Sequence, residues 1–598
     1  MKIRKPTIEI DSGVSIGGHT VPRIPRSIYV PMADGCRLAT DIYLPDGDET
    51  RSYPAILIFT PYYRRFKLVE GSEVEPSPNT AVYRDIFVSN GYAVLVTDVR
   101  GSGASFGTRD GFRSPAERRD SAFFADWVVA QPWCNGDIGV TGISYLGAAS
   151  DFLASTGHPA VKAIAPLFSV WDTYSDNYYP GGLQCSSLTQ LYDRQAAGLD
   201  LNRPDLLTDA SYFNHPDFLG PQPVDEDVDG ALVAAALEEH HGNFRQSELM
   251  ADLRFREEGL PYDPDYSSAS ISPYSYAEGV RPEVAILSVS GWYDGAGYAN
   301  GSIARFLTLD RNPHHLILGP WDHGARTHVS PWRTAVDAGT GIMDIVLRFF
   351  DTHLKGEDTG FDALDPVQFY SMHDEKWKSA RQWPPFSGAA TLYPGPAGTL
   401  DATPSEGLAE YQVDPVLGTG LHTRYERISG CAISDYYDDW AGRTDKMLSW
   451  ETAPFGEPFE FAGHAVLDLN LSIDKPDASI FVYLTEIEES GAERYITEGI
   501  LRAVHRKEAS PPANARATWP WRSFRREDLR PMPVDQAQQM RIPLLPIAWT
   551  LAAGSRLRLS LAGADCDHFI KVPHGPQPRM TIDLSRTRLV MPVGKTHD

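Results

Sequence analysis

The sequence of 598 residues contains few cysteines and no long apolar run. Its five cysteines are scattered, odd in number and form no CxxC or Cys/His cluster, which argues against a disulfide scaffold and a structural zinc site. No apolar run approaches the roughly 20 residues of a membrane-spanning helix. The basic N-terminus is not followed by the apolar stretch of about 7–15 residues that a secretory signal needs. These absences predict a soluble, cytoplasmic protein with buried thiols and no membrane partner.

Basic side chains are also in the minority, with 54 Lys and Arg against 79 Asp and Glu and a formal net charge of −25. An acidic protein repels phosphate backbones, so we expect no nucleic-acid partner. Hydrophobic residues make up 42% and charged residues 22%, which excludes a disordered or fibrous chain. At about 150 residues per domain, the length allows roughly four domains. A homo-oligomer is compatible with these totals but is not indicated by them.

Residues 1–167 have the pattern of a mostly parallel α/β sheet. Two short β-rich segments flank Asp34 and Gly35 and predict a hairpin. Residues 54–59 (PAILIF) and 92–97 (YAVLVT) are continuous apolar runs, as in strands that are buried on both faces. A helical period follows the second run, and further short strands come after it. Alternation of this kind is typical of a parallel sheet covered by helices.

The α/β pattern is interrupted and then resumes. Residues 168–280 are polar, rich in Tyr, Asp and Pro, and contain helical stretches near 229–241 and 244–259. Residues 281–360 return to strands and a helix. We therefore expect one core sheet in two parts, with a helical cap inserted between them.

Residues 361–598 have almost no helical periodicity. Short β-rich runs, beginning with residues 367–370, alternate with turn signals. This spacing predicts a C-terminal β jelly roll. The expected class is thus α/β, with a split core, an inserted helical cap and a β domain.

A candidate nucleophile lies at the turn after a short strand. Residues 139–141 run into Gly142-Ile143-Ser144-Tyr145-Leu146-Gly147, so that a strand reaches a glycine-flanked turn and opens a helix. This is the context of a nucleophile elbow, which exposes the serine hydroxyl above the sheet. Leu146 stands where the commonest form of the motif has glycine, and the motif alone also fits a structural Gly/Ser turn.

An acid and a base occupy the expected later positions. On such a sheet they follow the serine in chain order, each after a later strand. Asp294 and His323 follow the first two strands after the insertion, which predicts a triad of Ser144, His323 and Asp294. Asp322 competes for the role of the acid, although it is adjacent to His323 in the chain. Other histidines compete for the role of the base: His314, His315 and His328.

The oxyanion hole of such a site uses the backbone N–H after the nucleophile, here that of Tyr145, and a donor from a loop after an early strand. That loop, residues 59–65, lacks a His-Gly-Gly run. A tyrosine hydroxyl can supply the second donor, and both Tyr62 and Tyr63 are candidates.

Five motifs, taken together, resemble those of the cocaine-esterase-like hydrolases, which are related to X-Pro dipeptidyl-peptidases and α-amino-acid ester hydrolases. In chain order they are residues 60–63 (TPYY), 98–103 (DVRGSG), 142–147 (GISYLG), 291–294 (GWYD) and 319–323 (GPWDH). The resemblance extends from about residue 27 to the C-terminus. It implies an α/β-hydrolase core, a helical cap and a jelly roll packed near the active site.

The resemblance also implies roles for individual residues. By motif position Ser144 is the nucleophile, Asp294 the acid and His323 the base. Tyr62, which follows Pro61, matches the oxyanion tyrosine of the family. The segment 98–103 is interpreted as a structural loop.

Departures from the family patterns limit the substrate prediction. Residues 295–300 (GAGYAN) supply none of the acidic side chains with which α-amino-acid ester hydrolases hold an ammonium group. Ala296 is small for a benzoyl-ester pocket. Asp172 and Asp176 are candidates for a cation site in the cap, or for a solvated loop. The aromatic candidates for substrate binding, which would otherwise pack the cap or the core, are Phe168, Trp171 and Trp292.

We therefore predict a serine hydrolase that cleaves carboxylic esters, or related acyl bonds, of small molecules through an acyl-enzyme. No metal or organic cofactor is implied. The alternative enzyme is an X-Pro dipeptidyl-peptidase or an acylase that cleaves amides, although no site for a free N-terminal ammonium stands out. The alternative from another class is a glycan-binding protein with an inert hydrolase-like core.

Overall fold

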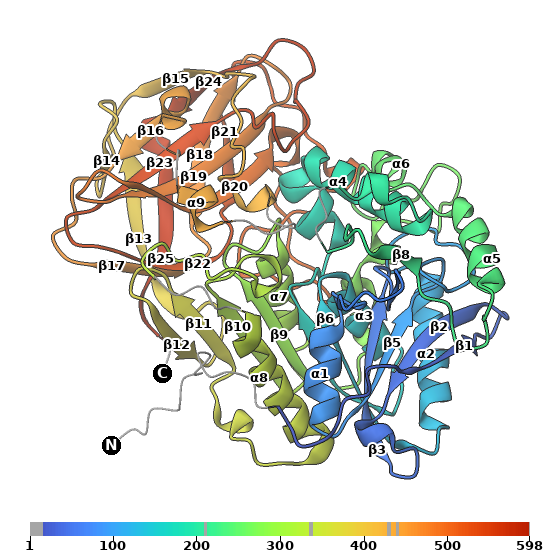
Figure 1. Cartoon of the computed structure of the whole chain (residues 1–598). Coiled ribbons are helices and arrows are strands. Elements are labelled where there is room, and N and C mark those ends of the chain that lie inside the picture. The colour runs from blue at the N-terminus through green and yellow to red at the C-terminus, as the bar shows by residue number, and fades with distance from the viewer. Residues whose placement is uncertain are drawn as a thin grey trace.

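A ten-stranded mixed sheet forms the centre of the first half of the chain (Figure 1). The structure is a computed structural model that describes residues 16–208, 212–333, 339–426, 432–437, 440 and 442–596. The strands are, in sheet order, β1 (Arg26–Pro31), β2 (Arg37–Tyr43), β5 (Ala93–Asp98), β3 (Tyr53–Thr60), β6 (Cys134–Ile143), β7 (Val161–Leu167), β9 (Ala285–Gly291), β10 (His314–Gly319), β11 (Val367–Ser371) and β12 (Lys376–Ala380). Strands from β5 to β11 are parallel, and the hairpin β1–β2 and strand β12 are antiparallel at the two edges.

Helices cover this sheet, as the alternating pattern predicts. Every residue of β3 and β5 is buried, because helices take both faces of the sheet away from water. The helices of the core are α1 (Ala81–Ser89), α2 (Pro115–Val129), α3 (Tyr145–Ala154), α7 (Tyr298–Thr308) and α8 (Gly339–Phe350). Within the described residues, no helix combines the length and the apolar character that a membrane crossing requires.

The segment between β7 and β9 leaves the sheet and forms the predicted cap. Its helices are α4 (Ser186–Asp200), α5 (Ala231–Glu239) and α6 (Gln246–Asp252), which Figure 1 shows above the core strands. Helix α5 lies within the predicted stretch 229–241, but α6 ends well before residue 259 and α4 was not predicted. A short antiparallel pair, β4 (Phe66–Leu68) with β8 (Phe218–Pro221), joins the cap to the loop after β3.

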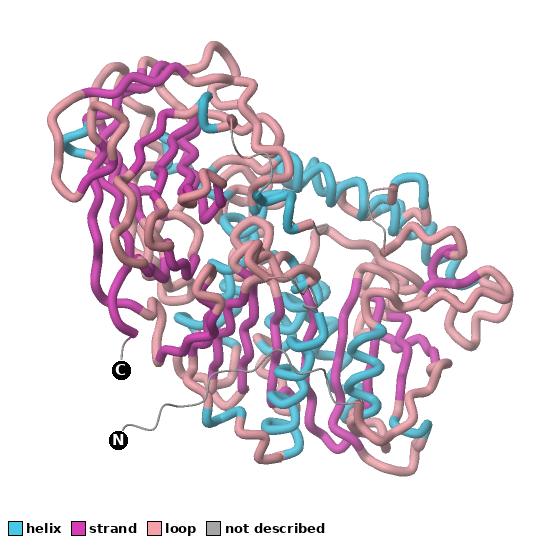
Figure 2. Tube along the Cα trace, turned by 60° about the vertical axis from the view of Figure 1, so that its left-hand side comes forward, coloured by secondary structure: helices cyan, strands magenta, loops and turns pink. Residues whose placement is uncertain are grey.

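The C-terminal part consists of two antiparallel sheets and confirms the expected β domain; Figure 2 shows its strands gathered apart from the helices of the core. One sheet has nine strands: β13 (Phe386–Pro394), β14 (Leu400–Asp401), β15 (Leu408–Gln412), β17 (Phe459–Gly463), β18 (Val466–Ile473), β21 (Gln538–Pro543), β22 (Ile547–Leu551), β24 (Arg579–Asp583) and β25 (Arg588–Thr596). The other has four: β16 (Leu448–Glu451), β23 (Arg556–Ala562), β19 (Ser479–Ile487) and β20 (Glu493–Arg502). A short helix, α9 (Ile433–Tyr437), precedes β16. One continuous apolar cluster runs through the core and this domain.

Two strands of the core sheet, β11 and β12, lie beyond the predicted boundary at residue 360. Residues 367–370, expected in the jelly roll, belong to β11, which pairs in parallel with β10 of the core sheet. The sequence could not show this because a short β-rich run does not reveal its partner. Beyond β11, the Met372 N–H donates to the Ala548 carbonyl at 2.9 Å, and the Thr550 N–H donates to the Met372 carbonyl at 3.0 Å. Backbone hydrogen bonds therefore join the core to β22. The other boundaries between the four predicted parts remain predictions.

Candidate active site

Ser144 lies at the sharp turn between β6 and α3. Its backbone has φ 64° and ψ −117°, a strained conformation for a residue with a side chain. A Cβ on Gly142 would meet the Leu146 Cβ at 2.2 Å, and one on Gly147 would meet two carbonyl oxygens at 2.8 Å. Both glycines are therefore needed for the turn. The Ser144 N–H donates to the Leu167 carbonyl at 2.8 Å and fixes the turn against β7.

His323 and Asp294 meet above the carboxyl ends of β10 and β9. The ring Nδ1 of His323 lies 2.6 Å from Asp294 Oδ1, and the Ser290 hydroxyl donates to Asp294 Oδ2 at 2.6 Å. Both members of the pair are buried. Burial raises the pKa of Asp294, and the charge and hydrogen bond of His323 oppose that rise. Because the carboxylate binds Nδ1, Nε2 is the ring atom that remains to accept a proton.

Two aromatic rings hold the imidazole of His323 in place. The Tyr298 ring centroid lies 5.0 Å from that of His323, and the Phe168 ring meets the imidazole edge-on at 6.3 Å and 85°. Phe168, a predicted substrate-binding residue, has no exposed surface. We assign it to the positioning of the His323 ring.

The competitors for acid and base have other partners. Asp322 Oδ1 accepts a hydrogen bond from the Thr327 N–H at 2.8 Å, and burial raises the pKa of Asp322 to about 6. His314 Nε2 lies 2.9 Å from the Ser288 hydroxyl. The remaining rings pack edge-on against aromatic neighbours, His315 on Phe361 and His328 on Tyr370.

The structure distinguishes the two tyrosines after β3. The Tyr63 hydroxyl donates to the carbonyl of Leu199 in the cap, and Tyr63 is buried. The Tyr62 ring is partly exposed, packs edge-on against Tyr145 at a centroid distance of 6.2 Å, and stacks on Phe213 at 5.6 Å. Burial of its hydroxyl raises the pKa of Tyr62 well above the ordinary value, so that the hydroxyl keeps its proton and can donate. Tyr62 packs against Tyr145, the residue after Ser144, and is thus the better placed of the two candidates for the oxyanion donor.

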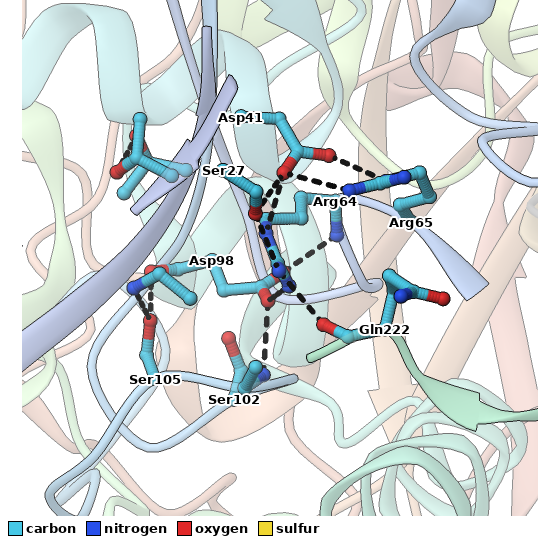
Figure 3. A network of polar contacts seen from close by, with 12 residues as sticks. Ser27, Asp41, Arg64, Arg65, Asp98, Ser102, Ser105 and Gln222 are labelled. Atoms are coloured by element: carbon cyan, nitrogen blue, oxygen red, sulfur yellow. Dashed lines mark hydrogen bonds and ion pairs between the residues drawn. The ribbon is translucent and has the colours of Figure 1, made fainter. Parts of the chain in front are cut away.

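A buried ion network, which sequence analysis missed, fixes the loop that carries Tyr62 (Figure 3). The fully buried Arg64 donates from Nη1 to Asp98 Oδ2 at 3.0 Å and from Nε to Asp41 Oδ1 at 3.1 Å. Its Nη2 also donates to the carbonyl of Gln222 in the cap at 2.7 Å. Arg65 binds the other oxygen of Asp41 at 2.9 Å. The only signal in the sequence is a pair of arginines after a buried strand.

The segment 98–103 wraps around the Asp98 carboxylate. The Ala104 N–H donates to Asp98 Oδ2 at 2.9 Å. A Cβ on Gly103, which has φ +57°, would lie 2.2 Å from the same oxygen. The motif therefore has a structural role, because it holds the Asp98 carboxylate that binds Arg64.

Helix α2 fixes the residue after the nucleophile. The Tyr145 hydroxyl donates to the Glu117 carboxylate, which also closes a capping box with Ser114 at the start of α2. Burial raises the pKa of Glu117 to about 7. Tyr145 is the first residue of α3, where a backbone N–H has no partner within the helix. Its amide is available to an oxyanion.

The C-terminal domain fixes the loop that carries Asp294. The Tyr293 hydroxyl donates to the Tyr495 carbonyl of this domain at 2.6 Å. Within the core sheet, Trp292 Nε1 donates to the Tyr370 carbonyl of β11 at 2.7 Å. The Tyr436 hydroxyl donates in turn to the Tyr293 carbonyl at 3.2 Å. Trp292, predicted to bind substrate, has no exposed surface, and we assign it to the positioning of the loop that carries Asp294.

Comparisons with known proteins give the family. The chain matches the X-Pro dipeptidyl-peptidase (S15 family) domain over residues 34–325 and the X-Pro dipeptidyl-peptidase C-terminal non-catalytic domain over residues 359–597. It is 37% identical to a putative serine esterase of Mycobacterium tuberculosis over 95% of both chains. The chain belongs to the X-Pro dipeptidyl-peptidase (S15) family of serine hydrolases.

Other similar proteins have lower sequence identity. Cocaine esterase from Rhodococcus is 29% identical over 81% of this chain and 84% of its own. Among solved structures, an α-amino acid ester hydrolase is 19% identical, with a TM-score of 0.69 over 99% of both chains. A CocE/NonD family hydrolase from Staphylococcus aureus is 17% identical, with a TM-score of 0.68 over 99% of both chains. The two solved structures confirm the predicted α/β-hydrolase core with a C-terminal β domain.

Within this S15-family chain, the two acidic candidates of the cap are buried and do not form a solvated loop. Asp176 Oδ2 accepts hydrogen bonds from the backbone N–H groups of Trp171, at 2.9 Å, and Asp172, at 2.8 Å. Asp172 Oδ2 in turn accepts from Arg256 Nε at 2.7 Å. Trp171 lines a cavity of about 110 Å³ between cap, core and C-terminal domain, and no triad residue lines it. Both carboxylates thus have structural partners.

Proposed function

We propose that Ser144, His323 and Asp294 form the catalytic triad of this serine hydrolase, and that the Tyr62 hydroxyl and the Tyr145 amide form its oxyanion hole. The observation that carries the proposal is the 2.6 Å contact between His323 Nδ1 and Asp294 Oδ1. It fixes the imidazole tautomer that leaves Nε2 to act as the base. The strained elbow at Ser144 is the matching feature on the side of the nucleophile.

In the proposed reaction the Ser144 Oγ attacks the substrate carbonyl while His323 Nε2 takes its proton. The negative charge of the tetrahedral intermediate develops on the former carbonyl oxygen, which Tyr62 and the Tyr145 amide stabilise. His323 then gives the proton to the leaving alcohol, and an acyl-enzyme remains. Water, activated by the same imidazole, releases the acid. Asp294 stays ionised throughout and stabilises the imidazolium.

Carboxylic esters of small molecules are the proposed substrates. Relatives named as esterases, at 37% and 29% identity, support this choice. An X-Pro dipeptidyl-peptidase needs a site for a free N-terminal ammonium, and the carboxylates of Asp172 and Asp176 already bind Arg256 and backbone amides. A cytoplasmic location is also part of the proposal, supported by the free thiols of Cys36, Cys134 and Cys566.

The first test replaces the nucleophile. Ser144→Ala is expected to lower kcat for an aryl ester by about 10⁴-fold or more, because the attacking oxygen is lost. It should also abolish labelling by a fluorophosphonate probe. Ser150→Ala, on the same helix, is the matched control and should keep both. Full activity or labelling in Ser144→Ala would overturn the triad, and absence of labelling in the wild-type protein would favour an inert core.

The second measurement addresses the bond that is cleaved. Rates with aryl esters and with Xaa-Pro anilides are compared on the wild-type protein. The proposal expects higher kcat/KM for the esters. A large preference for the anilides would replace the esterase assignment with the dipeptidyl-peptidase alternative.

A further inference from the structure

Arg113 is a buried cation beside the proposed oxyanion hole. It precedes the capping residue Ser114 of α2, has φ 57°, and is 5% exposed. Its guanidinium carbon lies 5.6 Å from the centroid of the Tyr145 ring, and its backbone N–H reaches the Tyr145 hydroxyl at 3.4 Å. The centroid of the Tyr62 ring lies 6.2 Å from that of the Tyr145 ring. Arg113 therefore belongs to the surroundings of the residue after the nucleophile.

Among the described residues, no carboxylate forms an ion pair with Arg113, and its buried Nε has no hydrogen-bond acceptor. Four other buried arginines have carboxylate partners: Arg64 with Asp41 and Asp98, Arg109 with Asp200, Arg256 with Asp172, and Arg305 with Asp151. The side chain of a fifth, Arg424, donates to two carbonyl groups and the Thr497 hydroxyl. Glu117, four residues further along the chain, is bound instead to the Tyr145 hydroxyl and the Ser114 N–H. A buried charge without a partner is costly unless a ligand supplies one.

The positive charge of Arg113 acts on two tyrosines of the proposed site, Tyr62 and Tyr298. Burial raises the pKa of Tyr62 and of Tyr298 well above their ordinary values, and the positive charge of Arg113 opposes both shifts. Tyr62 is the proposed oxyanion donor, and the Tyr298 ring packs against His323. The guanidinium is thus within electrostatic range of the groups that surround the scissile bond. An anionic group on a bound substrate would gain from this charge.

We propose that Arg113 binds a carboxylate of the substrate, so that this hydrolase prefers esters with an anionic group close to the scissile carbonyl. The guanidinium fork pairs with a carboxylate through two parallel hydrogen bonds, which also orients the ester over Ser144. The inference rests on the proposed function of Ser144. It assigns a specificity residue for that reaction, on the acyl side or on the alcohol side of the bond.

The test compares two matched substrate pairs. For the acyl side these are 4-nitrophenyl hydrogen glutarate and its neutral methyl ester, and for the alcohol side 4-acetoxybenzoate and its methyl ester. In the wild-type protein, kcat/KM corrected for spontaneous hydrolysis should favour the anionic member of one pair by about 10- to 100-fold, as expected for a charged hydrogen bond. Arg113→Met should remove this ratio, and Arg113→Lys should keep part of it. Arg119→Met, at an exposed position of α2, is the control and should keep the wild-type ratio.

Each outcome decides for or against the proposal. Equal or higher rates for the neutral esters in both pairs overturn it, as does an unchanged ratio in a folded Arg113→Met protein. If that variant does not fold, inhibition of the wild-type protein by glutarate and by dimethyl glutarate decides, and equal inhibition overturns the proposal. Ser144→Ala separates the proposal for the triad from the proposal for Arg113. Activity that survives in this variant refutes the triad, whatever the substrate ratio.

Discussion

The two loops that carry Tyr62, the proposed oxyanion donor, and Asp294, the proposed acid, are held in different ways. The loop after β3 is fixed by charge, through the buried Arg64 and the carboxylates of Asp41 and Asp98. The loop after β9 is fixed by neutral hydrogen bonds, from Tyr293 to the Tyr495 carbonyl and from Tyr436 to the Tyr293 carbonyl. The first set of contacts lies within the core and cap, whereas the second comes from the C-terminal domain.

This difference shows how the site depends on the whole chain. An ion network tolerates little change, because loss of the cation leaves buried carboxylates without compensation. Neutral hydrogen bonds to carbonyl groups cost less when one is lost. We therefore expect substitutions at the two loops to have different effects. Loss of the ion network after β3 should mainly lower stability, and loss of the neutral hydrogen bonds after β9 should mainly disturb the position of Asp294.

The largest effect on stability is expected at Arg64. Arg64→Met leaves Asp41 and Asp98 buried with fewer or no cationic partners, and should lower the free energy of unfolding by about 3–5 kcal/mol. Denaturant unfolding measures the loss. Arg65→Met is the matched control, since Arg65 also binds Asp41 but its side chain is 13% exposed, and it should cost less. Equal losses in the two variants would show that the network is not the main support of this loop.

The proposed donor on this loop is tested by a pair of tyrosine substitutions. Tyr62→Phe removes one oxyanion donor and should lower kcat by about 10²- to 10³-fold with little change in KM. Tyr63→Phe removes only the hydrogen bond to the Leu199 carbonyl and should change kcat by less than about tenfold. Steady-state kinetics on one aryl ester compares them. A larger loss in Tyr63→Phe would reverse the assignment.

The smallest effect is expected on the loop held by the C-terminal domain. Tyr293→Phe removes the hydroxyl that bonds to the Tyr495 carbonyl, which should cost about 1–3 kcal/mol of unfolding free energy and lower kcat several-fold. Tyr495→Phe is the control, because its hydroxyl bonds to Glu498 within the domain. It should affect stability but not kcat. Loss of kcat in the control alone would contradict a bracing role for Tyr293.

Local patterns in the sequence were sufficient for much of the fold and for the choice of the proposed triad residues. Runs such as residues 54–59 report burial on both faces, and chain order places Asp294 and His323 after successive strands. The acid–base pair at 2.6 Å agrees with that order. The choice of Tyr62 over Tyr63 came from resemblance alone, because the group that engages Tyr63, the Leu199 carbonyl, lies 136 residues away in the cap.

What the sequence did not show depends on distant partners. The carboxylates of the Arg64 network come from 23 and 34 residues away in the chain, and no local motif links them. Strand β11 has the composition of any buried strand, and only its pairing with β10 assigns it to the core sheet. Phe168 and Trp292 are aromatic residues near the motifs, and composition does not tell a residue that faces substrate from one that packs behind it.

The bond from Tyr293 to the Tyr495 carbonyl joins residues 202 positions apart. During synthesis at about 5–20 residues per second, the C-terminal partner leaves the ribosome roughly 10–40 s after the acid loop does. In that interval the nascent core contains Ser144 but lacks the contacts that fix the loop of Asp294. We therefore expect hydrolase activity to emerge only after the segment around Tyr495 has been made and has folded onto the core.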